Sequence, residues 1–404
     1  MKYIVILGDG MADEPIATLG NKTPLQVAHK PTIDKVTQMG QSGLLRTIPE
    51  GFSPGSEIAN LSVLGYDVAS VFEGRGTLEA ASIGVPIETD EMVMRCNLIC
   101  IEDNKIKNHS AGHISNEEAA ELITFLQEEL GSELVQFFNG VSYRHLCKIK
   151  NGDKRITCTP PHDVVGTPFQ DVLITAQVSE AEVTAKLLND LILHSHQLLE
   201  NHPVNIKRRT QGKDPANSIW FWSPGYKSSM KPLSDLFGIQ SGSVISAVDL
   251  IKGIGISAGL KSLDVEGATG LFNTNYEGKA QAAIEALKTD DFVFVHVEAS
   301  DEAGHEGDVD LKIKTIEYLS ERLIKPILEA ITTTILESVT IAILPDHPTP
   351  CRLRTHTADA VPFVIYNPTK APDEVTQFDE FSVQNGVLGT LKADEFMKQL
   401  FSKT

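Results

Sequence analysis

The sequence has little of several features that would assign it to particular classes of protein. Its cysteines are few, scattered and never in a CxxC pair (Cys96, Cys100, Cys147, Cys158 and Cys351), so neither a disulfide framework nor a zinc knuckle is indicated. Its longest apolar runs, such as YIVIL and IAIL, are too short to cross a bilayer. It has no GxxxxGK[ST] loop, so no Walker-type ATP site is evident.

Positive charge is also scarce, with 35 lysines and arginines against 54 acidic residues and a net charge of −19. This balance argues against a nucleic-acid or anionic-membrane partner, and an anionic substrate would need local cations. The N-terminal stretch MKYIVILGDGMADE has no small-residue cleavage pattern, so we expect a cytoplasmic protein. The sequence does not define an oligomeric state.

The chain alternates between short β-rich runs and helical patterns. Helical patterns cover 277–288 and 311–331, and β-rich runs lie at KYIVILGD near the N-terminus and at 291–299, 338–347 and 360–368. This alternation predicts an α/β domain whose parallel sheet is covered on both faces.

The middle of the chain differs in pattern, and 404 residues exceed the usual single core. Residues 85–165 have shorter, more polar runs with turn signals, which indicates a smaller module with antiparallel strands. A helix is expected over 176–200, and the polar stretch NHPVNIKRRTQGKDPANS then resembles a domain crossover. We therefore predict a discontinuous core domain, 1–82 with 213–404, and an inserted domain, 83–212.

Acidic and histidine side chains follow several of the predicted strands. They are Asp9 after YIVILG, Asp301 and His305 after FVFVHVEA, Asp346 and His347 after IAILP, and His356 nine residues later. Ligands of open parallel sheets bind at the carboxyl edge of the strands, so these segments predict one shared site.

Three carboxylates and three imidazoles without thiolates suit divalent ions such as Mn²⁺ or Zn²⁺. Asp301 and His305 are spaced i,i+4 and would share one face of a helix. Two such ions would leave a positive charge against three carboxylates, which suits a phosphate, and paired ions are a known arrangement for phosphoryl transfer. Taken singly, the Asp-x-x-x-His pair could be a solvated helix face and Asp346-His347 a turn.

The best candidate nucleophile is Ser56 in SPGSEIANLS, where a Pro-Gly turn leads into a helical segment. A serine at a helix N-terminus could be activated by a coordinated metal and could hold a phosphate against backbone N–H groups. The alternative is that Ser56 is an N-cap.

Several long motifs support a family resemblance across almost the whole chain. They are ILGDGMAD, GSEIANLSVLGYD, EGRGTLEAAS, RCNLI, HSAGHIS, VSYRHL, PPHDVVGTP, VDLIKGIG, HVEASDEAGHEGD, PDH and RTHTADAVPFVIY. The sequence resembles the short, archaeal-type 2,3-bisphosphoglycerate-independent phosphoglycerate mutases of the alkaline phosphatase-like metalloenzyme superfamily. This implies an α/β, alkaline phosphatase-like core with a mostly parallel sheet between helices, and a smaller inserted α+β domain.

The resemblance also implies a site with two divalent metal ions and no bisphosphoglycerate cofactor. One ion would be held by Asp9, Ser56, Asp346 and His347, and the other by Asp301, His305 and His356. Of the other ionisable residues in 296–310, Glu298 is expected nearby and His296 in the core, while Glu306, Asp308 and Asp310 are expected to be solvated.

The implied reaction is the glycolytic and gluconeogenic interconversion of 3-phosphoglycerate and 2-phosphoglycerate through a phosphorylated Ser56. The inserted domain would close over the site to exclude water. The candidate residues for the small phosphorylated carboxylate are Arg75, Arg144 and Lys252 as cations, with His113 and Asp163 assisting proton transfer. Lys207-Arg208-Arg209 could be a further clamp or a solvated linker.

Two departures from the family pattern keep other activities open. Phe72-Glu73 stands before GRGT where an aromatic-Thr pair is usual, and His109 stands where an acid is commoner. The alternatives are a homoserine kinase-like phosphotransferase, a phosphohydrolase, or a metal-binding regulatory protein without turnover. The complete set of seven metal-site residues argues against the last of these.

Overall fold

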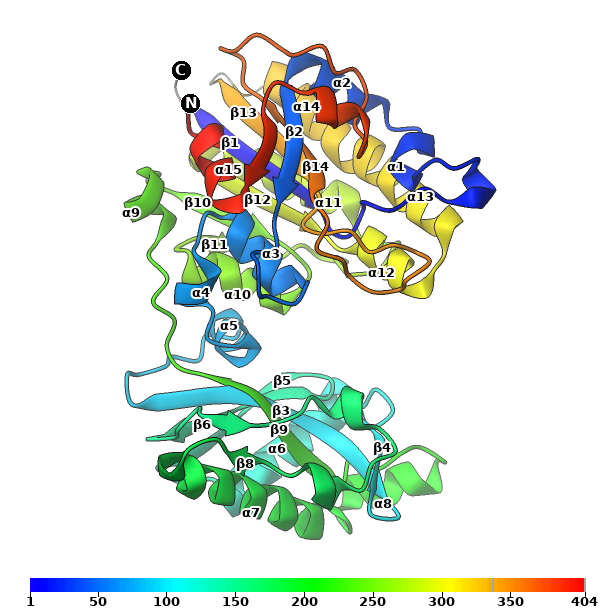
Figure 1. Ribbon diagram of the computed structural model, residues 1–404. Coiled ribbons are helices and arrows are strands. Elements are labelled where there is room, and N and C mark those ends of the chain that lie inside the picture. The colour runs from blue at the N-terminus through cyan, green and yellow to red at the C-terminus, as the bar shows by residue number, and fades with distance from the viewer. Residues whose placement is uncertain (334, 336–337, 403–404) are drawn as a thin grey trace. The chain divides into compact units, whose positions relative to one another are not determined.

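The structure, a computed structural model, describes residues 1–333, 335 and 338–402. The chain divides into two compact units, Met1–Phe72 with Ser229–Thr404, and Glu73–Ser228 (Figure 1). None of the helices in the described part of the chain is long and apolar enough to span a bilayer.

The first unit contains a mostly parallel eight-stranded sheet in the order β11-β10-β12-β1-β13-β14-β2-β15. Its strands are β1 (Lys2–Gly8), β2 (Gln41–Arg46), β10 (Gly242–Ile245), β11 (Lys261–Ser262), β12 (Phe292–Val297), β13 (Val339–Leu344), β14 (Val361–Tyr366) and β15 (Gly389–Lys392). Only β14 runs antiparallel to its neighbours among these strands. The apolar runs of β1, β12 and β13 are buried along their whole length, as expected for strands covered on both faces.

Helices pack on both faces of this sheet (Figure 1). The α-helices are α1 (Pro24–Val27), α2 (Pro31–Met39), α3 (Ser56–Val63), α4 (Val68–Val71), α9 (Leu233–Phe237), α10 (Asp249–Ser257), α11 (Tyr276–Thr289), α12 (Ala299–Glu306), α13 (Val309–Tyr318), α14 (Lys325–Thr333) and α15 (Ala393–Leu400). A π-helical segment, Leu319–Ile324, joins α13 to α14. The single helix predicted over 311–331 is therefore two α-helices with a wider turn between them.

The second unit is built on antiparallel strands, among which β3 pairs with β4, β6 and β9. Its elements are α5 (Arg75–Ser82), β3 (Glu91–Glu102), β4 (Lys105–Asn108), α6 (Asn116–Leu130), β5 (Val135–Val141), β6 (Arg144–Lys150), β7 (Ile156–Thr157), β8 (Thr175–Ala176), α7 (Glu182–Leu199), α8 (Pro203–Thr210) and β9 (Ser218–Gly225). Its core joins apolar side chains of α6 and α7 to those of β3 and β9. The predicted fold class, a mostly parallel α/β sheet between helices with a smaller α+β part, is confirmed.

The crossovers between the units lie elsewhere than the ranges 1–82, 83–212 and 213–404 predict. They fall at 72/73 and 228/229, because α5 and β9 both pack on β3. The stretch expected to be a polar crossover instead forms α8 and leads into β9, inside the second unit.

Candidate active site

Three buried aspartates meet at the carboxyl edge of the parallel sheet. Asp9 follows β1, Asp301 lies in the first turn of α12 after β12, and Asp346 follows β13. Strands β12, β1 and β13 are parallel neighbours, so their carboxyl ends coincide. The exposed fractions are only 1% for Asp9, 5% for Asp301 and 0% for Asp346.

Asp9 lies where carboxylate charge is poorly compensated. Its Oδ2 lies 2.9 Å from His296 Nε2, whereas its buried Oδ1 has no hydrogen-bond partner. Burial, together with the charges of Asp346 and Asp301, raises the pKa of Asp9 well above its ordinary value. A cation at this position would relieve both the unmet acceptor and the repulsion between carboxylates.

Ser56 is the first residue of α3, and Gly55 holds the N-cap position, so the N-cap alternative for Ser56 is wrong. Its Oγ donates to Asp9 Oδ2 (3.4 Å) and lies 3.1 Å from His347 Nε2. Asn60, one turn further along α3, donates to the Ser56 carbonyl (2.8 Å) and to Asp346 Oδ2 (3.0 Å). The start of α3 is thereby fixed against the aspartate cluster.

The histidines surround Asp301. Asp301 Oδ2 lies 3.2 Å from His305 Nε2, and its Oδ1 lies 3.3 Å from His356 Nε2. The rings of His347 and His356 are in contact, with centroids 4.0 Å apart. His356 reaches this edge because it lies in the loop between β13 and the antiparallel β14.

Asp301 differs from Asp9 in its electrostatic surroundings. Burial acts to raise the pKa of Asp301, but hydrogen bonds with His305 and His356 hold it well below its ordinary value. The hydrogen bond with Asp301 in turn raises the pKa of His305 to about 9. Burial lowers the pKa of His347 and brings that of His296 to about 3, so both are neutral imidazoles able to act as ligands.

Two groups of side chains in the described part of the chain fit a metal ion. They are Asp9, His296 and Asp346, and Asp301, His347 and His356, and within each group the ligand atoms lie within 4.8 Å of one another. With the unpartnered Asp9 Oδ1, this donor set of carboxylates and imidazoles fits divalent cations. The prediction paired His347 with Asp9, and the structure places His347 Nε2 between the groups, 3.6 Å from Asp9 Oδ1.

Sequence reasoning missed three polar residues of this cluster. His296 is fully buried, as expected of a core residue, but it contacts Asp9 rather than serving only as packing. Asn60 bonds to Asp346, and Thr349 donates through Oγ1 to Asp301 Oδ1. Each lies in an apolar or loop context that gives no signal, apart from the position of His296 five residues before Asp301.

Most of the predicted substrate residues lie in the second unit. Within it, Arg144 and His113 both flank the Tyr143 ring, at 5.5 Å and 6.0 Å from its centroid. Asp163 lies 3.7 Å from its neighbour His162, whose ring contacts that of His109. Arg75 starts α5, and its backbone N–H donates to Ser223 Oγ (2.9 Å).

The other charged candidates have partners or are exposed. Lys252, in the first unit, pairs with Asp264 at 2.7 Å. Arg208 is buried and donates to Ala111 O (2.6 Å), so it is not a solvated linker residue. Lys207 and Arg209 are exposed near the end of α8, where Arg209 pairs with Glu200. Three acidic residues predicted to be solvated are exposed in the structure, namely Glu306, Asp308 and Asp310.

Glu73, the acid that departs from the family pattern, is compensated within the second unit. Its carboxylate pairs with Lys154 and accepts from Tyr226 N (3.3 Å). Its charge therefore does not stand alone beside Arg75.

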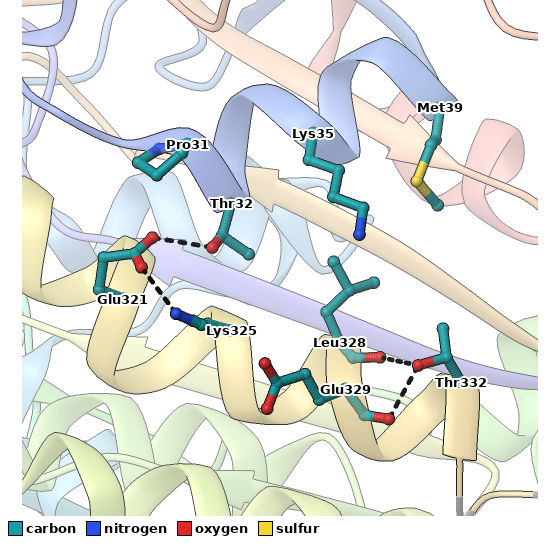
Figure 2. Close-up of a pocket in the computed structure, with 9 residues that line it drawn as sticks. All are labelled: Pro31, Thr32, Lys35, Met39, Glu321, Lys325, Leu328, Glu329 and Thr332. Carbon is teal, nitrogen blue, oxygen red and sulfur yellow. Dashed lines mark hydrogen bonds and ion pairs between the residues drawn. The ribbon is translucent and has the colours of Figure 1, made fainter.

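A separate surface cavity of about 290 Å³ lies between α2 and the segment from the π-helix to α14 (Figure 2). Glu321 lines this cavity, where its carboxylate accepts a hydrogen bond from Thr32 Oγ1 (2.8 Å) and pairs with Lys325 (3.4 Å). None of its lining residues is a candidate catalytic or metal-binding residue.

Comparison with known proteins identifies the relatives of the chain. A family model described as 2,3-bisphosphoglycerate-independent phosphoglycerate mutase matches residues 37–205. A protein of that name from Methanosarcina acetivorans is 52% identical over 402 residues, covering 99% of both chains. The structure of the PH0037 protein from Pyrococcus horikoshii superposes with a TM-score of 0.83 at 28% identity, covering 100% of this chain and 98% of that one. A cofactor-independent phosphoglycerate mutase from Thermoplasma acidophilum gives 0.69 at 25% identity, covering 99% of each.

Proposed function

The chain belongs to the family of 2,3-bisphosphoglycerate-independent phosphoglycerate mutases, and from this premise we propose that it interconverts 3-phosphoglycerate and 2-phosphoglycerate through a phosphoserine at Ser56. The observation that carries the proposal is the position of Ser56 Oγ, 3.4 Å from Asp9 Oδ2 and 3.1 Å from His347 Nε2. A hydroxyl at a helix start beside such a cluster is suited to accept a phosphoryl group.

The proposed reaction has two transfers. The Ser56 hydroxyl loses its proton and its Oγ attacks the phosphorus of 3-phosphoglycerate. The bond from phosphorus to the C3 oxygen breaks, and that oxygen takes up a proton. The 2-hydroxyl of the same glycerate then loses a proton and attacks the phosphorus, the Oγ–P bond breaks, and Ser56 Oγ takes up a proton. Two divalent cations, Mn²⁺ or Zn²⁺, bound by the Asp and His groups would neutralise phosphoryl oxygens and favour the serine alkoxide.

The residues of the chain have separate tasks in this scheme. Asn60 fixes Ser56 relative to Asp346, and the N-terminus of α3 favours negative charge on a phosphorylated serine. Arg75, Arg144 and Lys252 are the proposed cations for the substrate carboxylate and phosphate, and His113 and Asp163 the proposed proton-transfer residues. With Glu73 paired to Lys154, that departure from the family pattern gives no support to another acceptor.

The test compares two serine variants on the same helix. Wild-type protein is given Mn²⁺ and 3-phosphoglycerate without 2,3-bisphosphoglycerate, and 2-phosphoglycerate is measured by coupling to enolase. Ser56→Ala should reduce kcat by about 10³-fold or more, as loss of a nucleophile does. Ser62→Ala, at a buried position of the same helix, should retain activity.

Other products would overturn the assignment. Release of inorganic phosphate without 2-phosphoglycerate would indicate a phosphohydrolase, and ATP-dependent phosphorylation of homoserine would indicate a phosphotransferase. The proposed location is the cytoplasm, in keeping with five cysteines that are all free thiols.

A further inference from the structure

Lys312 is a fully buried lysine on α13 whose role lies outside the proposed chemistry. Its exposed fraction is 0%, and its ammonium donates to Ala12 O (3.0 Å), Asp13 Oδ2 (2.8 Å) and Thr349 O (2.8 Å). An ammonium has three N–H donors, so all of them are used. The acceptors belong to two loops, residues 9–14 after β1 (the β1 loop) and residues 345–351 after β13 (the β13 loop).

Asp13 extends the link between the same two loops. Its Oδ1 accepts from Glu14 N (2.8 Å) in the β1 loop, and its Oδ2 accepts from Cys351 N (3.1 Å) in the β13 loop. Both side chains of the Lys312–Asp13 pair are completely buried. The pair therefore joins three segments, the two loops and α13.

Thr349 connects this link to the candidate metal ligands. Its carbonyl accepts from Lys312, while its Oγ1 donates to Asp301 Oδ1 and lies 3.3 Å from His347 Nδ1. The β1 loop begins with Asp9, and α13 directly follows the helix that carries Asp301 and His305. One ammonium is thus bonded directly to the two loops that carry Asp9 and Asp346, and it is linked to Asp301 through Thr349.

We propose that Lys312 is a positioning residue, whose ammonium holds the β1 loop, the β13 loop and α13 together so that the aspartates share one geometry before a divalent cation binds. The inference rests on the proposed function only in treating the cluster as metal-binding.

A purely stabilising role explains this arrangement poorly. Burying two charges costs roughly what their attraction returns, and apolar replacements of buried pairs are often neutral or stabilising. Groups that orient metal ligands without touching the metal, by contrast, typically change metal affinity or activity by about 10–100-fold when they are removed.

The test is a Mn²⁺ titration of the full-length chain without substrate, with free Mn²⁺ followed by electron paramagnetic resonance. Lys312→Met should weaken Mn²⁺ binding by about tenfold or more, and excess Mn²⁺ should restore most of its activity. The control is Lys30→Met, since Lys30 is also buried and its ammonium pairs with Asp34 at 3.0 Å, a residue of α2 outside both loops. Equal Mn²⁺ affinity in Lys312→Met and wild type would overturn the proposal.

A second variant covers the case in which Lys312→Met does not fold. Asp13→Asn keeps the shape of the partner and removes its charge, so it should also weaken Mn²⁺ binding, and wild-type affinity in this variant would overturn the proposal. Failure of the proposed function has a different signature, because wild type would then bind Mn²⁺ without producing 2-phosphoglycerate. The ratio of affinities between variant and wild type would still decide the role of Lys312.

Discussion

At the scale of single residues, the site depends on polar side chains that are completely enclosed. His296 has both ring nitrogens engaged, Nε2 at 2.9 Å from Asp9 Oδ2 and Nδ1 at 3.1 Å from Ser246 Oγ. An imidazole held between a hydroxyl and a carboxylate fixes the orientation of that carboxylate, or joins it as a ligand. In either role His296 is part of the chemistry of Asp9 and not only of the packing.

Replacing His296 by phenylalanine separates these roles from simple core packing. Phenylalanine preserves a planar buried ring but cannot contact Asp9 through a polar atom. We expect kcat/KM for 3-phosphoglycerate to fall by about 10–100-fold, with a parallel loss of Mn²⁺ affinity in a calorimetric titration. Ser246→Ala, which removes the Nδ1 partner and the acceptor of Val248 N but leaves the Asp9 contact in place, should have a smaller effect. Full activity in His296→Phe would show that His296 has only a packing role.

The aspartates could be predicted from sequence and the enclosed polar residues could not, for a physical reason. Asp9 and Asp346 stand where an apolar run ends, and parallel strands bring such ends together. His296 lies inside the run FVFVHV and Asn60 inside a helix that is buried along almost its whole length, where the same pattern is produced by any satisfied buried polar group. Lys312 gave no signal because its acceptors are mostly backbone carbonyls.

At the scale of elements, the turn that follows β1 brings three segments into close contact. Gly10 has φ +61°, and a Cβ placed on it would lie 2.7 Å from the Asp301 Cα and 2.6 Å from Thr349 Oγ1. Its N–H donates to Asp346 Oδ1 (3.2 Å). A side chain at this position would be strained by the positive φ, and its Cβ would clash with the backbone of Asp301.

Gly10→Ala should therefore disturb the site, and Gly20→Ala provides a matched control. Gly20 has a similar φ of +68° with nothing within 4 Å of its added Cβ, so its substitution should cost only ~1 kcal/mol of left-handed strain. Gly10→Ala should cost more than this and lower kcat by about tenfold or more, because the clash displaces Asp301. Urea unfolding and the enolase-coupled assay measure the two effects, and equal activities would refute the argument.

The elements themselves were predicted where a single pattern runs from end to end. The β-rich runs became β1, β12, β13 and β14, and the pattern over 277–288 became α11. The π-helical segment Leu319–Ile324 was not predicted, because one extra residue in a turn barely alters an apolar periodicity. Likewise α8 was not predicted. It begins with a proline, Pro203, and is mostly polar, and both features are also typical of a connection between domains.

At the scale of the whole molecule, the two units differ in whether they carry candidate metal ligands. Composition indicated a distinct middle segment, but it could not show that α5 and β9 pack on β3, since that depends on tertiary contacts. The first unit carries every candidate metal ligand, including three buried carboxylates, in a chain of net charge −19. A cation bound there would stabilise this unit by mass action and would relieve the repulsion between the carboxylates.

Removing divalent cations should therefore affect the two units unequally. A ligand at 100 times its Kd stabilises the state that binds it by about 2.7 kcal/mol, and that increment belongs to the unit that holds the ligands. On adding EDTA to Mn²⁺-loaded protein, we expect faster amide hydrogen exchange in residues 9–14, 299–306 and 345–356. The amides of β3 and α6, in the second unit, serve as the internal control and should exchange at unchanged rates. Equal acceleration in both units, or none in the first, would contradict a metal site built only from the first unit.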